Sequence, residues 1–238
     1  MRNEMPFLLM GTSPFIGAGQ FRSKAYFYYQ KFYLNPKNTE HLFLKAFELG
    51  IKGVQLLPYP PVVEALRKAL EKHKEVFVVG TLRFEDPLGD LELLPSLGCR
   101  VALLHGALTD NSSLEAISHF LKLVEKQGMV SGVVTHTPRA TLSRLLKKGL
   151  EPQVTMVPFN KAGLFMDCSP EELVELARRF RDSAFIVKKV LGAGRIPLEE
   201  AFAFLRENWF FESVAIGLAS EEEVEEAIQA SSKTFNRV

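Results

Sequence analysis

Eight short apolar runs punctuate this chain, and an amphipathic stretch follows each of them. Near-continuous apolar runs are typical of strands buried on both faces of a parallel sheet, and the stretches between them have helical spacing. Eight strand-then-helix units in 238 residues predict an α/β protein with a closed (β/α)₈ TIM barrel, a single domain over residues 1–238. A doubly wound open sheet is the alternative, but no dominant glycine-rich fingerprint follows the first run. The eight runs are Phe7–Gly11, Gly53–Leu57, Val76–Thr81, Val101–His105, Ser131–His136, Val154–Phe159, Ala184–Val190 and Ser213–Gly217.

The helical stretches carry recognisable start and stop signals. Ser169 and Ser220 each precede a glutamate by three residues, which is the pattern of a capping box. The third unit differs, because Pro87, Gly89 and Pro95 interrupt it. We therefore expect regular helices in most units and a short or irregular helix in the third.

The composition narrows the range of partners. The chain has 29 Lys and Arg against 28 Asp and Glu, a net charge of +1, which gives no reason to expect a polyanionic partner such as nucleic acid. No stretch approaches the ~20 apolar residues of a membrane span, and the opening residues lack a long apolar segment. Cys99 and Cys168 stand in unrelated contexts, as expected in a reducing compartment. We expect a cytoplasmic protein that binds a small-molecule substrate and neither nucleic acid nor membrane.

An unusually long connection, residues 13–38, separates the first apolar run from the first predicted helix, which begins near Thr39. Connections of this length are usually functional or disordered, and disordered segments are poor in aromatic residues. This connection is rich in them, and every residue of Tyr26–Tyr29 is aromatic. Two interpretations remain: a lid over the mouth of the barrel, or an apolar surface through which the chain forms a homo-oligomer.

Polar residues at the carboxyl ends of the strands are the candidates for chemistry, because barrels of this kind carry their active sites there. His105 and His136 each end an apolar run, where a polar side chain needs a reason for its burial. Each is either satisfied by a local hydrogen bond or faces bound substrate as a donor or general acid. A catalytic zinc needs three protein ligands, and no third histidine or carboxylate stands at a strand end, so we expect no metal site.

Two consecutive lysines, Lys188 and Lys189, stand near the end of the seventh run. Side chains alternate faces along a strand, so only one of the two is expected to point toward the barrel axis. The alternation shared with apolar Phe185 and Val187 predicts that Lys189 is the inward residue. An inward lysine could pair with an anion, transfer a proton at depressed pKa or form an imine. The alternative is that both ammonium groups simply reach water.

A short glycine-containing loop follows the lysines and precedes a predicted helix. Gly192, Gly194 and Arg195 combine free backbone N–H groups with a positive charge, which favours the binding of an anion such as phosphate. The glycines alternatively serve only a tight turn. The start of the eighth helix is less suited to an anion, because Glu221–Glu223 fill its first turn with negative charge.

A series of segments, in order and across most of the chain, carries a family resemblance. They are GTSPFIGAGQF, AFELGIKGVQLLPY, ALLHG, VVTHTPR, VPFNKAG, KVLGAG and AIGLASEEEVEEAI. In this order they resemble the aldo-keto reductase superfamily, and most closely a short, poorly characterised branch of it. The resemblance implies the same barrel, and it implies carbonyl reduction with NADPH.

The resemblance also implies a catalytic tetrad of aspartate, tyrosine, lysine and histidine after the second, third and fourth strands. Gln55 stands where the aspartate is expected, and Tyr59 lies near the position of the tyrosine. Leu82 takes the place of the lysine, with Arg83 beside it, and only His105 matches outright. The tetrad is therefore incomplete.

The NADP cofactor that the resemblance implies is not the favoured interpretation. A hydride-transfer site needs a proton donor held at a suitable pKa, and Leu82 cannot supply the charge of the missing lysine. No arginine follows the eighth strand to hold a 2′-phosphate, and Glu221–Glu223 would repel one.

Three functions remain open. The leading hypothesis is a barrel enzyme with a rebuilt site for a small oxygenated metabolite, anionic or neutral. His105 and His136 would act as acid, base or hydrogen-bond donors, and Lys189 as the cationic or nucleophilic group. The alternatives are an NAD(P)H-dependent carbonyl oxidoreductase with atypical catalytic residues, and a non-catalytic ligand-binding or assembly protein. Further polar side chains at strand ends are expected to orient the substrate: Gln55, Tyr59 and Asn160.

Overall fold

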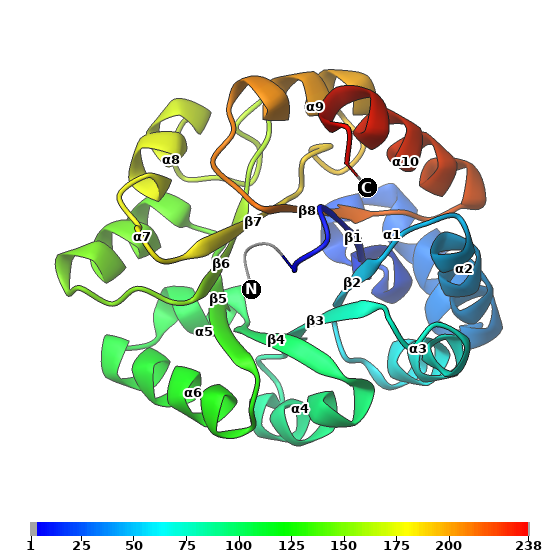
Figure 1. The fold of residues 1–238 in the computed structure, drawn as a ribbon, viewed down its shortest axis with the longest axis horizontal. Coiled ribbons are helices and arrows are strands. Elements are labelled where there is room, and N and C mark those ends of the chain that lie inside the picture. The colour runs from blue at the N-terminus through cyan, green and yellow to red at the C-terminus, as the bar shows by residue number, and fades with distance from the viewer. Residues whose placement is uncertain (1–3, 238) are drawn as a thin grey trace.

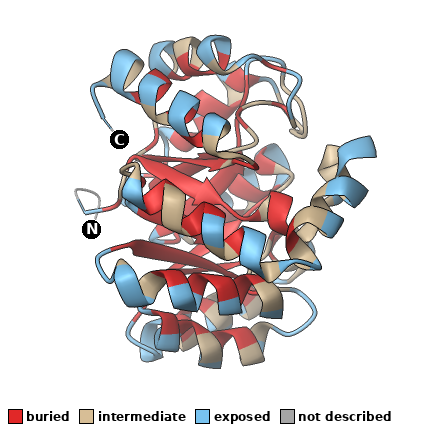
Figure 2. Ribbon diagram, turned by 90° about the vertical axis from the view of Figure 1, so that its right-hand side faces the viewer, coloured by how far each residue is buried: buried red, intermediate tan, exposed pale blue. Residues whose placement is uncertain are grey.

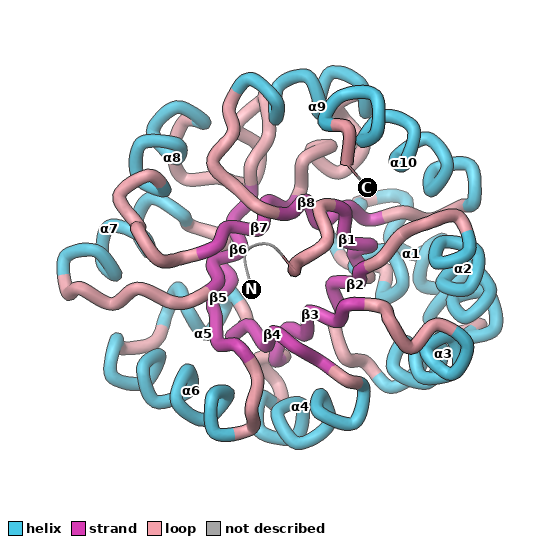
Figure 3. The backbone as a smooth tube through the Cα atoms, in the orientation of Figure 1, coloured by secondary structure: helices cyan, strands magenta, loops and turns pink. Residues whose placement is uncertain are grey.

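A ring of eight parallel strands forms the centre of the computed structural model, which describes residues 4–237. Each strand pairs with the next one along the chain, and β8 pairs with β1, so the barrel is closed (Figures 1 and 3). The predicted (β/α)₈ barrel is confirmed. The strands are β1 (Leu8–Gly11), β2 (Gly53–Leu56), β3 (Phe77–Leu82), β4 (Cys99–Leu104), β5 (Val130–Val134), β6 (Val154–Pro158), β7 (Ala184–Lys188) and β8 (Ser213–Gly217).

Helices surround the ring, with their buried faces toward the strands and their exposed faces outward (Figure 2). Serine side chains cap three of these helices, and each accepts a hydrogen bond from the backbone N–H three residues later. Two of these caps, Ser169 and Ser220, were predicted from the sequence. The helices are α1 (Ser23–Tyr28), α2 (Pro36–Glu48), α3 (Pro60–Lys72), α4 (Pro87–Leu93), α5 (Gly106–Asn111), α6 (Leu114–Lys126), α7 (Pro138–Lys147), α8 (Pro170–Ala177), α9 (Leu198–Glu207) and α10 (Glu221–Phe235).

Two units depart from the regular pattern. In the third, the short helix α4 runs into a 3₁₀ helix, η4 (Leu94–Leu97), so the irregularity expected from its prolines is confirmed. In the first, the connection after β1 is not an unstructured loop. It is built from the 3₁₀ helices η1 (Ser13–Ile16) and η2 (Gly19–Phe21), then α1 and the π-helix η3 (Tyr29–Tyr33). The helix α2 then begins at Pro36, three residues before the predicted start at Thr39.

The strands separate two apolar layers, and these layers fix which side chains point into the barrel. Ala184 and Ile186 of β7 belong to the small cluster inside the ring, whereas Phe185 and Val187 belong to the larger cluster between strands and helices. The alternation therefore places Lys188, the last residue of β7, on the inner face. The prediction that Lys189 is the inward residue of the strand is wrong. Because both faces of the strand are buried and apolar, the run itself does not distinguish inside from outside.

Within residues 4–237, no helix combines the length and the apolar character needed to cross a membrane.

Candidate active site

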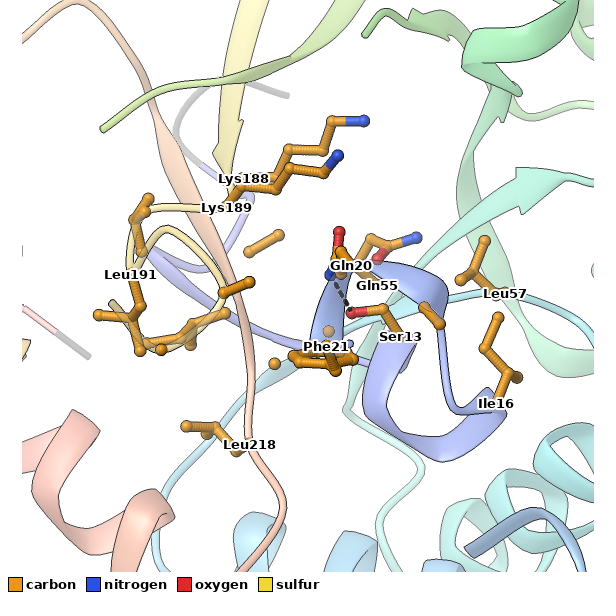
Figure 4. A pocket seen from close by; sticks show the side chains of 18 of the residues that line it. Ser13, Ile16, Gln20, Phe21, Gln55, Leu57, Lys188, Lys189, Leu191 and Leu218 are labelled. Carbon is orange, nitrogen blue, oxygen red and sulfur yellow. Dashed lines mark hydrogen bonds between the residues drawn. The ribbon is translucent and has the colours of Figure 1, made fainter. Parts of the chain in front are cut away.

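A cavity of about 420 Å³ opens at the carboxyl ends of the strands. This volume is in the range of small-molecule sites. Its wall is formed by the ends of β1, β2, β7 and β8, by residues that follow β4 and β5, and by the helical connection after β1. Figure 4 shows the side chains of Lys188 and Lys189 running side by side on one wall, with Gln20 and Gln55 beside the cavity opposite them.

His105 follows β4 directly and is the N-cap residue of α5. Its Nδ1 accepts a hydrogen bond of 3.1 Å from the backbone N–H of Ala107. Nδ1 is therefore unprotonated in the neutral ring, and the proton is on Nε2. The imidazole lines the cavity, so Nε2–H is available there as a donor. The local hydrogen bond and the functional placement, which the sequence left as alternatives, occur together.

His136 and Lys188 meet in the cavity, although they lie 52 residues apart in sequence. Lys188 Nζ lies 3.2 Å from Nδ1 of His136. The ring of His136 also stands edge-on to that of His105, with the ring centroids 5.6 Å apart. Two imidazoles and one amine therefore converge from the ends of three strands, β4, β5 and β7.

Asp110 on α5 holds His136 in place. Its carboxylate accepts hydrogen bonds from the backbone N–H of His136 at 2.8 Å and from the hydroxyls of Thr135 and Thr141 at 2.6 and 2.8 Å. On the other side the ring packs on Gly106, where an added Cβ would lie only 2.6 Å from His136 Cδ2. Asp110 and Gly106 are both residues that the sequence reasoning missed as parts of the site.

Lys189 reaches the same cavity because its backbone is left-handed. Its φ is 57°, a conformation that costs on the order of 1–3 kcal/mol for a residue other than glycine and is concentrated at functional sites. Successive residues of an extended strand point to opposite faces. The turn at Lys189 breaks that alternation, so two consecutive lysines line one cavity. The amine of Lys189 lies over the ring of Phe165, 4.6 Å from its centroid.

The cavity disfavours positive charge on every one of these groups. Desolvation lowers the pKa of His136 to about 3, with smaller contributions from Lys188, Lys189 and His105. Desolvation, followed by the charge of Lys188, also lowers the pKa of His105. Both imidazoles are therefore neutral at pH 7. Burial, together with the neighbouring Lys189, lowers the pKa of Lys188 well below its ordinary value, and burial lowers that of Lys189.

Gln55 occupies the predicted position on the inner face of β2. Its side chain is 8% exposed, lines the cavity and donates a 3.0 Å hydrogen bond to the hydroxyl of Thr81. Across the mouth, Gln20 of η2 donates to Ser13 Oγ at 3.3 Å (Figure 4). These amides give the cavity neutral polar groups opposite its lysines.

Tyr59 and Asn160 are not brought to the cavity. The hydroxyl of Tyr59 donates to Glu85 at 3.3 Å, and its ring lies under the guanidinium of Arg83. The side chain of Asn160 is 1% exposed and bonds at both ends to the backbone of Leu164, which shapes the loop after β6. Their predicted roles in substrate binding therefore lack a structural basis, because each side chain is engaged elsewhere.

The loop after β7 does not present the free amides that the sequence suggested. The N–H of Gly192 donates to Lys189 O at 2.9 Å, and those of Gly194 and Arg195 donate to Leu191 O at 3.0 and 2.9 Å. The φ values of 56° and 83° at the two glycines show that they serve a tight turn. The guanidinium of Arg195 lies over the ring of Phe165. The helix α9 starts only at Leu198 and has two glutamates in its first turn, so neither free amides nor a positive helix end supports the anion site, which stays a prediction.

Arg83, which stands beside the expected catalytic lysine, is turned away from the cavity. Its side chain donates to both oxygens of Asp90, and its own N–H donates to Asp90 Oδ2 at 2.7 Å. Asp90 is fully buried, and the side chain of Arg83 is 17% exposed. The pair ties the end of β3 to α4.

The aromatic segment after β1 has two different faces. Its inner face, with Ile16, Phe21 and Tyr28, lines the cavity. Its outer face carries Tyr26 and Phe27, which are 69% and 58% exposed. The inner face supports the interpretation as a lid, whereas oligomerisation through the outer face stays a prediction.

Potential metal ligands do not gather anywhere in residues 4–237: no three His, Cys, Asp or Glu side chains come together as a metal site.

Comparisons with known proteins relate this chain to others by its fold. No protein-family model matches the sequence, and a search of curated proteins finds no significant match. Solved structures do match: a proposed aldo-keto reductase from Pseudomonas aeruginosa has a TM-score of 0.64 and 18% identity over 94% of this chain and 89% of that one. Gox0644, solved as a variant in complex with NADPH, has a TM-score of 0.64 and 17% identity over 82% and 79% of the two chains. KGPDC from Streptococcus mutans has a TM-score of 0.60 and 10% identity over 98% of both.

The molecule is thus a (β/α)₈ barrel, and aldo-keto reductases are among the solved structures that it resembles. They agree with the family that the sequence segments resemble. At these identities the likeness concerns the fold alone, and barrels of this architecture support many different chemistries. The function must therefore be argued from the residues of the cavity.

Proposed function

We propose that this protein is an enzyme that acts on a small oxygenated metabolite, most favourably an anionic one, in the cavity at the carboxyl ends of the strands. One observation carries the proposal: Lys188, Lys189, His105 and His136 come from three strand ends and line one cavity. Groups with shifted pKa values that converge in a pocket are typical of active sites, because structural packing alone gives no reason to bury them together.

The four groups have distinct roles in this proposal. His105, held by the Ala107 amide, donates a hydrogen bond from Nε2–H to an oxygen of the substrate. His136 orients the amine of Lys188 through Nδ1. The two lysines provide the attraction for an anionic substrate, and whichever amine is neutral also has a lone pair for chemistry. The lysine that points into the barrel from its strand is Lys188, where the sequence had favoured Lys189.

The residues at the end of β8 do not fit the 2′-phosphate of NADPH. Glu223 and Glu226 line that side of the cavity, and their carboxylates would repel a phosphate. The amides there are also occupied, because the N–H of Ala219 donates to Glu223 at 2.7 Å and that of Glu223 donates to Ser220 Oγ at 3.2 Å. We therefore place no step of the reaction on a nicotinamide, although the barrel is shared with a protein solved with NADPH.

The proposal is tested by incubating the protein with a panel of small oxo acids, hydroxy acids, aldehydes and sugar acids, with and without NADPH. We expect NMR to show that wild-type protein consumes at least one anionic compound in the absence of NADPH, and that His105→Phe does not. Thermal unfolding should shift with that compound and not with NADPH. Consumption only in the presence of NADPH would establish the reductase instead, and no binding or turnover of any compound would overturn an enzymatic role.

Fluorescence of the single tryptophan is unsuited to this test. Trp209 stacks on Phe211 and lies against Phe7 and Phe235, in the connection that enters β8. This is the amino-terminal end of the strands, opposite to the cavity. A cofactor in the cavity would leave its emission unchanged.

A further inference from the structure

We propose that Lys188 forms an imine with the keto group of a small 2-oxo acid, whose carboxylate is held by Lys189. This inference rests on the proposed function. The proposal assigns different tasks to two neighbouring lysines that line one cavity. It narrows the substrate from an oxygenated metabolite to a carbonyl compound with a carboxylate on the adjacent carbon.

The first argument is the position of the two amines. Lys188 is the last residue of β7 and shares the inner face of the strand with Ile186. Lys189 would point away from the cavity in an extended backbone, and only its left-handed φ of 57° returns it to the same wall. A strained conformation that brings a second cation beside the first is explained by a ligand with two neighbouring groups to bind.

The second argument is the lack of a counter-charge at Lys188. Within residues 4–237 neither lysine of the pair forms an ion pair with a carboxylate, and the hydrogen-bond partner of Lys188 is the neutral His136. Asp110 is the acid whose charge acts on the pKa of Lys188, and that carboxylate already accepts hydrogen bonds from His136 N–H, Thr135 and Thr141. An amine that is buried beside another cation is more easily neutral, and a neutral amine is the form that attacks a carbonyl.

The third argument is the different setting of Lys189. Its amine lies over the π face of Phe165, a contact that favours the charged form. Lys189 is also the first residue after the end of β7, whereas Lys188 belongs to the strand. Burial lowers the pKa of both lysines, but that of Lys188 is the one lowered well below its ordinary value. Lys189 is therefore the better suited of the two to remain a cation and to hold a carboxylate, while Lys188 reacts.

The covalent step balances with water as its only by-product. The lone pair of Lys188 Nζ forms a bond to the keto carbon, the π electrons of the C=O bond move to its oxygen, and a proton passes from nitrogen to that oxygen. The resulting hydroxyl takes a proton from solvent and leaves as water, while the Nε2–H of His105 donates a hydrogen bond to it. The remaining lone pair on nitrogen then completes the C=N bond. No oxidant, reductant or metal takes part.

Borohydride trapping tests the inference. The protein is incubated with pyruvate or glyoxylate, reduced with sodium borohydride and examined by intact mass and peptide mapping. We expect one reduced adduct per chain, on the peptide that contains Lys188, and at least about tenfold more of it than acetone gives at equal concentration. Lys188→Met should remove this adduct, and Lys189→Met should remove the preference for oxo acids while acetaldehyde still reacts.

Exposed Lys72 provides the matched control, because Lys72→Met should label as the wild type does. Circular dichroism and thermal unfolding establish that each variant is folded. Labelling confined to surface lysines, or none, would overturn the imine, and equal trapping of pyruvate and acetone would overturn the assignment of the oxo-acid class. If the metabolite panel is consumed without any trapped adduct, the imine fails while the proposed function stands.

Discussion

Replacing Lys188 with methionine is expected to raise the stability of the protein and to abolish its chemistry. Methionine has a similar length and suits the apolar interior formed by Ile186, Met156 and Ala215. Removal of the buried amine should increase the free energy of unfolding by about 1–2 kcal/mol at pH 7. Turnover of the substrate found in the metabolite panel should fall by on the order of 10³-fold or more. A residue that costs stability and is needed for turnover is a functional residue.

The gain in stability should depend on pH in a defined direction. The pKa of Lys188 is lowered by folding, so the unfolded chain binds its proton more tightly than the native protein does. The native state therefore loses stability as the pH falls from about 10.4, the ordinary lysine value, to the folded pKa, and the loss is constant below that. The advantage of Lys188→Met over wild type should grow over the same interval. Removing Lys188 also removes its charge from His105 and His136, but both imidazoles are neutral above pH 7. The comparison above pH 7 therefore reports mainly on Lys188.

Urea denaturation at several pH values measures this difference. The matched control is Lys72→Met, an exposed lysine whose removal should change stability by less than about 0.5 kcal/mol. If Lys188→Met were destabilising by 2 kcal/mol or more, the amine would be a structural element, and its burial would need no functional explanation.

Replacing Asp90 with asparagine is expected to lower the free energy of unfolding by about 3–5 kcal/mol, the cost of breaking a buried ion pair. Both carboxylate oxygens of Asp90 accept hydrogen bonds from Arg83, from its guanidinium and from its backbone N–H. Asparagine puts an NH₂ group in place of one of those oxygens, so donors face donors around a guanidinium that is still largely buried.

An exposed ion pair gives the comparison for this effect. Lys161 and Glu200 are 2.6 Å apart, but their side chains are 55% and 54% exposed. Glu200→Gln should therefore cost less than about 1 kcal/mol. Equal effects of Asp90→Asn and Glu200→Gln in urea denaturation would contradict the structural role assigned to the Arg83–Asp90 pair.

Most of the fold could be predicted from the sequence because each unit is encoded locally. The apolar runs at Val154 and Ser213 begin where β6 and β8 begin, and Pro87 starts the short helix of the irregular third unit. The apolar runs do not show which side chains of a strand point into the barrel and which point toward the helices. A barrel strand is apolar on both faces, so Phe185 and Val187 look like inner residues although they pack against helices.

The candidate site could be predicted only in part, for a related reason. His105 and His136 stand out because a histidine at the end of a buried strand has few explanations. The sequence pattern predicted Lys189, not Lys188, as the inward lysine of the strand. The left-handed backbone at Lys189 could not be foreseen, because no glycine stands there. Knowing that Ala184 and Ile186 line the interior would have identified Lys188 as inward.

Other side chains at the strand ends have hydrogen-bond partners that are distant in sequence or are backbone atoms, and the sequence does not show these partners. Asn160 bonds to the backbone of Leu164, and Tyr59 bonds to Glu85 across the next unit. The amides of Gly192 and Gly194 close their own turn. A side chain at a strand end is therefore only a candidate until its hydrogen bonds are known.

Titration of Lys188 tests the central claim most directly. Protein labelled with ¹³C at lysine Cε can be followed by NMR as the pH is raised, and the signal that is missing from Lys188→Met identifies the residue. The structure predicts that this lysine loses its proton well below the ~10.4 of an ordinary lysine. If Lys188 titrates together with the surface lysines, its amine is charged and solvated, and the cavity has no reactive nucleophile.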